Sequence, residues 1–67
     1  MKLIINGDER EIAATGVAAL LRELGIEPER PGTAVARNDE VVPRNRWSET
    51  PLADGDRIEI ITAVQGG

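Results

Sequence analysis

The end of the chain is the first candidate for chemistry. The last two residues are Gly66 and Gly67, so the terminal carboxylate has no side chain beside it. Because glycine lacks Cβ, two in succession form a narrow strip of backbone that can enter a channel and leaves the terminal acyl carbon unhindered. Such an end suits a partner enzyme that attaches AMP to the carboxylate and then admits a nucleophile to the same carbon. Chain ends are often small and polar, so the pair alone is weak evidence.

Few other side chains offer chemistry. The chain has no cysteine and no histidine, so it lacks disulfides, side-chain persulfides and the usual ligands of zinc and other transition metals. Asp54 and Asp56 form an Asp-Gly-Asp sequence, which is ordinary turn chemistry before a strand rather than a catalytic pair. The sequence contains neither of two glycine-rich nucleotide-binding motifs, G-x-x-x-x-G-K-[ST] and G-x-G-x-x-G. We therefore expect no metal and no cofactor on this chain, so that ATP would be bound and used by a partner adenylyltransferase.

Length and composition favour a protein on which others act. With 67 residues, 40% hydrophobic and 30% charged, the chain is expected to be one domain over residues 1–67, with 65–67 as a flexible tail. So small a core leaves little room for an enclosed active site, and we expect no enzyme. The net charge of −4 disfavours nucleic acid, and no apolar run approaches the roughly 20 residues that span a bilayer. We expect a cytoplasmic protein that is a monomer when free.

The chain begins with a predicted hairpin. Residues 2–5 are strand-like, and Asn6-Gly7 is a strong turn signal because a type I′ turn needs positive φ at both positions. Residues 9–13 are the expected returning strand.

A short helix should follow. Thr15 is the expected N-cap, and Gly25 suits a left-handed helix end on which Ile26 folds back. Between them, apolar residues at i, i+3, i+4 and i+7 predict one buried stripe: Val17, Leu20, Leu21 and Leu24.

The second half predicts three more strands. Residues 33–37 and 40–42 are strand-like around an Asn38-Asp39 turn, although the pattern does not decide which way residues 34–36 face. A loop follows, with one helical turn expected near 45–48. Residues 57–64 form the most strand-like stretch, and apolar side chains on both of its faces indicate a central strand or one with a recognition surface.

The predicted order is therefore β-β-α-β-β-turn-β. A single main helix on one face of a four- to five-stranded mixed sheet is a two-layer α+β fold. A first hairpin, a crossing helix and a late central strand match the ubiquitin-like β-grasp plan.

The chain resembles the ThiS family of sulfur carriers along nearly its whole length. The resemblance is carried by the Asn6-Gly7 hairpin, the helix, the Asp54-Gly55-Asp56 turn and the terminal glycines, and above all by one segment. This segment, residues 38–47, reads Asn-Asp-Glu-Val-Val-Pro-Arg-x-x-Trp.

The resemblance implies a role in forming the thiazole of thiamin. In such proteins an E1-like adenylyltransferase (ThiF) uses ATP to adenylate the C-terminal carboxylate, and sulfur from a persulfide donor converts it to a thiocarboxylate. Thiazole synthase (ThiG) then takes the sulfur. Carried over here, the covalent attachment point is Gly67, and Gly66 and Gln65 form the tail that the partners recognise.

Two alternatives stay open. The chain could carry sulfur for another pathway, either molybdopterin synthesis, as MoaD-like proteins do, or cysteine synthesis. It could also be a ubiquitin-like modifier or interaction module. In each case a docking surface beside the tail is expected, and we predict a small apolar patch of Ile4, Ile61 and Ala63. Trp47, the one aromatic residue, is interpreted as a structural anchor.

Overall fold

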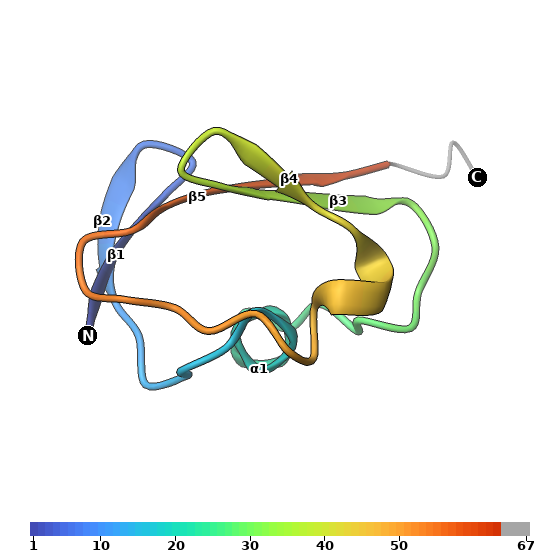
Figure 1. Cartoon of the computed structure of the whole chain (residues 1–67), viewed down its shortest axis with the longest axis horizontal. Helices are drawn as coiled ribbons and strands as arrows, with labels where there is room; N and C mark the ends of the chain where they lie inside the picture. The colour runs from blue at the N-terminus through green and yellow to red at the C-terminus, as the bar shows by residue number, and fades with distance from the viewer. Residues whose placement is uncertain (64–67) are drawn as a thin grey trace.

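The structure is a computed structural model that describes residues 1–63 (Figure 1). Its elements follow the predicted order. They are β1 (Lys2–Ile5), β2 (Asp8–Glu11), α1 (Val17–Glu23), β3 (Thr33–Arg37), β4 (Glu40–Val42), the 3-10 helix η1 (Arg44–Arg46) and β5 (Arg57–Thr62). Within the described range, no helix is long and apolar enough to cross a membrane.

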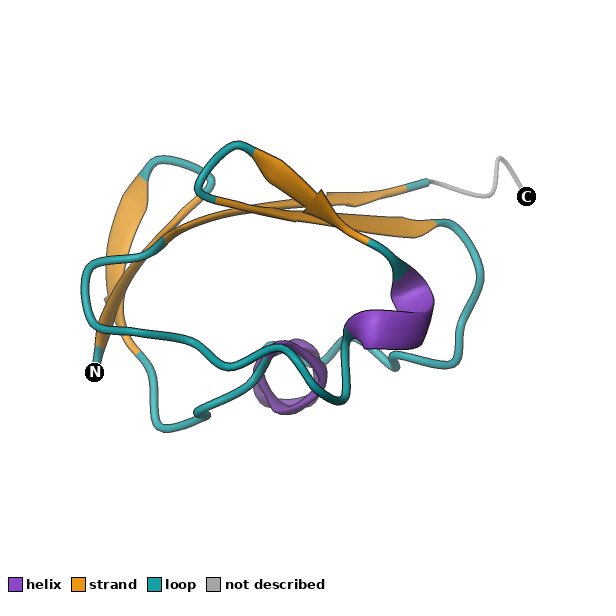
Figure 2. Cartoon of the chain, viewed as in Figure 1, coloured by secondary structure: helices purple, strands orange, loops and turns teal. Residues whose placement is uncertain are grey.

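The strands form one mixed sheet in the order β2-β1-β5-β3-β4. The last strand in the sequence, β5, lies at the centre, parallel to β1 and antiparallel to β3. Figure 2 shows α1 and η1 on the same side of this sheet, so the molecule has two layers. The predicted α+β β-grasp fold, with a mixed sheet and one main helix on one face, is confirmed.

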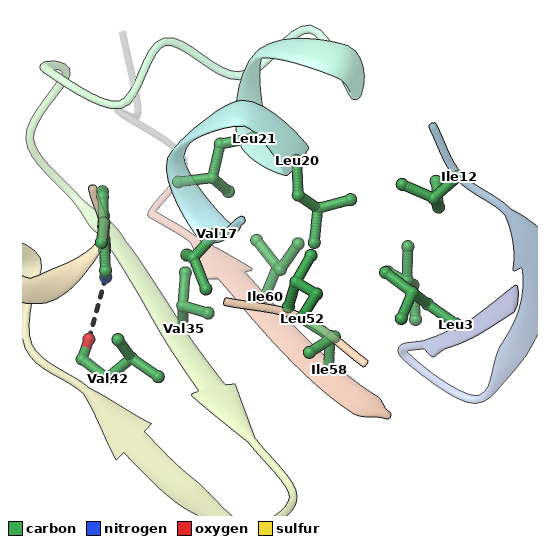
Figure 3. Close-up of a cluster of buried hydrophobic side chains, with 12 residues drawn as sticks. Leu3, Ile12, Val17, Leu20, Leu21, Val35, Val42, Leu52, Ile58 and Ile60 are labelled. Carbon is green, nitrogen blue, oxygen red and sulfur yellow. Dashed lines mark hydrogen bonds between the residues drawn. The ribbon is translucent and has the colours of Figure 1, made fainter. Parts of the chain in front are cut away.

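The inner face of the sheet and the apolar stripe of α1 share one core. Val17, Leu20 and Leu21 are completely buried, and Figure 3 shows them facing the side chains of the sheet. Burying a side chain of this size stabilises the fold by about 1.5–3 kcal/mol. The buried set is Leu3, Ile5, Ile12, Val17, Leu20, Leu21, Val35, Val42, Trp47, Leu52, Ile58 and Ile60.

The helix begins one residue later than the N-cap prediction. Its N-cap is Gly16, with no side-chain capping bond, so the prediction of Thr15 as the cap is wrong. The first helical N–H groups are satisfied from elsewhere: Val17 N donates to Thr50 O at 3.1 Å and Ala18 N donates to Trp47 O at 3.1 Å. Backbone carbonyls of a distant loop have therefore replaced the side-chain cap.

The helix ends as predicted. Gly25 has φ +82°. Its N–H donates to Arg22 O at 3.0 Å, and Ile26 N donates to Leu21 O at 2.8 Å. These two bonds are those of a Schellman motif, in which the residue after the left-handed glycine folds back over the last turn.

Both predicted hairpin turns form, but the first returning strand is displaced. Asn6 has φ +50° and Gly7 has φ +88°, as a type I′ turn requires. The strand spans Asp8–Glu11 rather than 9–13. Its predicted end leaves the sheet because the N–H groups of Ala13 and Ala14 donate to the Glu23 carboxylate, at 3.1 and 2.9 Å.

Asp56 is a buried carboxylate that joins β5 to the turn between β3 and β4. It is 7% exposed. Its oxygens accept hydrogen bonds from Arg37 Nε at 2.7 Å, Asn38 Nδ2 at 3.0 Å and Ala53 N at 2.8 Å. Burial by itself raises the pKa, but these bonds and the Arg37 charge outweigh it and hold the pKa of Asp56 below its usual 3.8.

Acid is expected to destabilise the fold through this group. The pKa of Asp56 is lower in the folded state than in the unfolded state, where it is about 4. The ionised carboxylate therefore contributes its full stabilisation of the fold above the unfolded pKa, and this contribution is lost as pH falls through the folded pKa. Asp56→Asn should lower the free energy of unfolding at neutral pH by roughly 1–3 kcal/mol and reduce its dependence on pH below about 4. Urea unfolding of both proteins at neutral and acid pH measures this effect. Equal acid sensitivity in the two proteins would contradict the assignment.

Candidate functional site

The residues of the predicted chemistry follow β5. Gly67, Gly66 and Gln65 lie outside the described residues, as does Val64, the predicted last residue of the strand. The structure describes the chain up to Ala63, which directly follows β5. Because β5 is hydrogen-bonded to β1 on one side and β3 on the other, it is the central strand of the sheet (Figure 1).

Successive side chains of β5 alternate between the two faces of the sheet. Ile58 and Ile60 are 1% and 8% exposed and lie in the core. Ile61 is 69% exposed on the outer face, away from α1. Ile61, a residue of the predicted apolar patch, therefore points away from the helix, and a large apolar side chain faces solvent two residues before the end of the described residues.

On the two strands beyond β5, small or apolar side chains continue the outer face, while Glu59 lies on the same face of β5 as Ile61. Ala34 of β3 pairs with Ile61, and Ala36 pairs with Val41 of β4. Val41 is 72% exposed, and it and Ile61 are the exposed large hydrophobic residues of the described part. We call this surface the outer patch; it consists of Ala34, Ala36, Val41, Ile61 and Ala63.

Ile4 does not belong to the outer patch. Ile4 lies on the same face as Ile61, but its side chain is half-buried, and its strand partners are the charged residues Glu9 and Arg57. Arg57 and Ile61 are four residues apart on β5, which is about 13 Å along a strand. The predicted set of Ile4, Ile61 and Ala63 is therefore divided, because the strand register places Ile4 beside the other end of β5.

Charged side chains occupy the part of the outer face around Ile4. Lys2 Nζ lies 3.8 Å from Glu9, and Arg57 Nη2 lies 2.7 Å from Asp39. Exposed pairs of this kind add little stability. They do make this half of the face polar, so a partner that buries apolar surface fits the outer patch better.

Sequence reasoning missed Val41. The short run Glu40-Val41-Val42 does not show which valine faces the core. The pairing of Val42 with Val35 decides it, because Val35 is 2% exposed and its partner points the same way. A three-residue strand is too short for its alternation to be read without its neighbour.

Arg44 and Trp47, from the segment that carries the family resemblance, are structural. Trp47 is 3% exposed, and its Nε1 donates to Val42 O at 2.9 Å. The Arg44 guanidinium lies 4.5 Å from the centroid of the Trp47 ring and donates to the carbonyls of Pro28 and Arg30. The pair therefore joins η1 to the loop that precedes β3, as the structural interpretation of Trp47 predicted.

The acidic residues before β5 serve the turn. Asp54 Oδ1 accepts from Lys2 N at 2.7 Å, and Gly55 N donates to Lys2 O at 2.7 Å. Asp56 is held by Arg37, Asn38 and Ala53 as described above. No group of three or more potential metal ligands was found in residues 1–63. The Asp-Gly-Asp sequence thus closes a turn, as predicted.

Comparison with known proteins agrees with the resemblance. The ThiS family model matches residues 3–67. A thiazole synthase of Paramagnetospirillum magneticum is 44% identical over 68 residues, a match that covers all of this chain but only 20% of that protein. The sulfur carrier protein ThiS of Thermus thermophilus is 33% identical over 63 residues, which cover 94% of this chain and 95% of the relative.

A solved structure extends the likeness to three dimensions. The crystal structure of the thiamine biosynthesis protein ThiS from Geobacter metallireducens has a TM-score of 0.81 at 28% sequence identity, and each chain is covered in full. The family model spans nearly the whole sequence, and the ThiS relatives are matched along almost their entire length. This chain therefore belongs to the ThiS family of sulfur carrier proteins.

Proposed function

We propose that this protein carries sulfur for the thiazole step of thiamin biosynthesis, as a thiocarboxylate on Gly67. The observation that carries the proposal is the family match, which runs through the last residue and so includes the Gly66-Gly67 end. The chain acts as a protein cosubstrate, and the catalysts are its partners. These partners need an accessible terminal carboxylate, residues without bulky side chains next to it, and a folded domain to bind.

The proposed chemistry on Gly67 has three steps. A carboxylate oxygen attacks the α-phosphorus of ATP on a ThiF-like adenylyltransferase, which forms the acyl-adenylate and releases pyrophosphate. The terminal sulfur of a cysteine persulfide then attacks the acyl carbon and displaces AMP, giving an acyl disulfide. A thiol reduces that disulfide and leaves the thiocarboxylate. Gln65 and Gly66 are the proposed recognition residues behind it, since glycine adds no side chain near the reacting carbon.

The proposed acceptor of the sulfur is a ThiG-like thiazole synthase. A region similar to this whole chain occurs inside a protein named thiazole synthase, of which it makes up 20%. A carrier-like segment and a thiazole synthase on one polypeptide support the idea that the two act together.

The outer patch is the proposed docking surface for these partners. It lies on the face of the sheet away from α1, and Ala63 belongs both to the patch and to the base of the tail. A partner that covers the patch is therefore close to the residues that continue from Ala63. Apolar side chains at the centre with charged groups beside them are the usual composition of a protein interface.

Mass spectrometry tests the proposed function. The purified chain is incubated with a ThiF-like adenylyltransferase, ATP and a persulfide donor, and the expected product has one oxygen replaced by sulfur. A ThiG-like synthase with its substrates should then return the chain to its original mass. Higher-mass adducts on lysines would indicate a modifier instead. Loading without discharge by ThiG, but with discharge by a molybdopterin or cysteine synthase, would assign another pathway.

A further inference from the structure

Gly32 lies directly beside the last described residue of the chain. Ala63 N donates to Gly32 O at 2.7 Å, one step beyond the pair of Thr33 and Thr62. A Cβ on Gly32 would lie 3.2 Å from the Cβ of Ala63. Facing Cβ atoms of paired strands are normally about 4.5–5.5 Å apart, so a side chain at residue 32 would have to displace Ala63.

The other glycines with positive φ are different. Gly32 has φ +93°, and Gly7, Gly25 and Gly55 have φ between +82° and +88°. A Cβ on any of those three would meet nothing within 4 Å. Their backbone conformation alone accounts for glycine, whereas at residue 32 the conformation and the tight contact with Ala63 both favour it.

The loop that carries Gly32 is anchored to the core from the other end. Arg44 Nη2 donates to Arg30 O at 2.8 Å, Arg44 Nη1 donates to Pro28 O, and the guanidinium stacks on buried Trp47. The loop is thus fixed near Pro28 and Arg30 and reaches Ala63 through Gly32. A continuous set of contacts joins the Trp47 anchor to the base of the C-terminal residues.

We propose that Gly32, on the loop anchored by Arg44, is a positioning residue for sulfur loading, because its contact sets where Ala63 lies relative to the other residues of the outer patch. This inference rests on the proposed function. The partner must hold the patch while Gly67 reaches its active site, so the position of Ala63 sets the point from which the remaining residues start toward that site. A misplacement of about 1 Å can cost roughly a hundredfold in rate.

The experiment compares Gly32→Ala with a matched control, Gly55→Ala. Both substitutions put alanine at a positive φ, but only the one at residue 32 meets Ala63. Loading by the adenylyltransferase is followed by mass spectrometry at a temperature where circular dichroism shows every variant folded. Gly32→Ala is expected to lower kcat by roughly tenfold or more with little change in KM, because the large apolar residues of the outer patch, Val41 and Ile61, are left in place. Gly55→Ala should stay within about twofold of the wild type.

The effect of the contact between residues 32 and 63 is isolated by repeating the measurement in chains that carry Ala63→Gly. Ala63→Gly removes the methyl that an alanine at residue 32 would strike but leaves the strained backbone conformation unchanged. In this background, Gly32→Ala should lower kcat by less than about threefold, so the two substitutions are coupled. Amide hydrogen exchange of Ala63 should be faster in Gly32→Ala and unchanged in Gly55→Ala, which reports the displacement in the free protein.

The outcomes separate the two proposals. A wild-type chain that accepts no sulfur overturns the proposed function, and the role of Gly32 with it. If the wild type is loaded but Gly32→Ala has the same kcat as Gly55→Ala, the positioning role alone is overturned. The same holds if Gly32→Ala lowers kcat equally with and without Ala63→Gly. Should Gly32→Ala not fold, Arg44→Gln frees the same loop without changing the backbone at residue 32. An unchanged kcat in that variant overturns the proposal, and a tenfold fall with faster Ala63 exchange supports it.

Discussion

Deleting Gly67 is expected to abolish sulfur loading and leave the fold intact. The shortened chain still ends in a glycine carboxylate, but its reach falls by about 3.5 Å, the length of one extended residue. Adenylation needs the carboxylate aligned with the α-phosphorus, and even about 1 Å of misplacement costs roughly a hundredfold. The core residues lie between Leu3 and Ile60, so the thermal unfolding midpoint should not change.

The matched control is Gly67→Ala, which keeps the length of the chain and adds only a Cβ next to the reacting carbon. It should be loaded more slowly than the wild type but measurably, whereas the deletion gives no thiocarboxylate in the mass spectrum. A deletion variant loaded at the wild-type rate would show that the terminal carboxylate of Gly67 is not the attachment point.

The second large effect is expected from Ile61→Asp. Ile61 is 69% exposed in the outer patch, so a charge there is solvated in the free protein but loses water when a partner covers it. Binding to the adenylyltransferase should weaken by at least about 2 kcal/mol, roughly thirtyfold, as expected for a central interface residue. Titration calorimetry with the purified partner measures this change.

The control for Ile61→Asp is Ala19→Asp, which places the same charge on an exposed position of α1, in the other layer of the molecule. It should bind like the wild type. Aspartate is unfavourable in a strand by up to about 1 kcal/mol, so both variants are compared where circular dichroism shows them folded. Equal affinity of Ile61→Asp and Ala19→Asp would move the docking surface away from the outer patch.

Local patterns in the sequence predicted the turns and the helix end correctly, because backbone chemistry at those sites decides the structure. The Asn6-Gly7 turn, the Asn38-Asp39 turn and the Gly25 helix end all have the expected positive φ values. Each depends on residues that tolerate the left-handed region, and no distant part of the chain is needed to choose it.

Where a distant segment supplied the partner, sequence reasoning failed. Thr15 is a good capping residue, but the carbonyls of Trp47 and Thr50 occupy the first N–H groups of α1. The returning strand of the first hairpin stops early because Glu23, on the helix, takes the N–H groups of Ala13 and Ala14. Neither contact can be read from the local sequence, since the groups that meet are nine to more than thirty residues apart.

The sequence alone determined the family, the two-layer plan and the identity of the Gly66-Gly67 end, because these depend on residue order, periodicity and turn chemistry. Only the tertiary structure decided which apolar residues form one outer surface. Ile4 and Ile61 share a face, but the pairing of β1 with β5 separates them, while the pairing of β3 with β5 and β4 places Ala34 beside Ile61 and Ala36 beside Val41. The physical reason is strand register, which sets neighbours across a sheet and is chosen by the packing of the whole core.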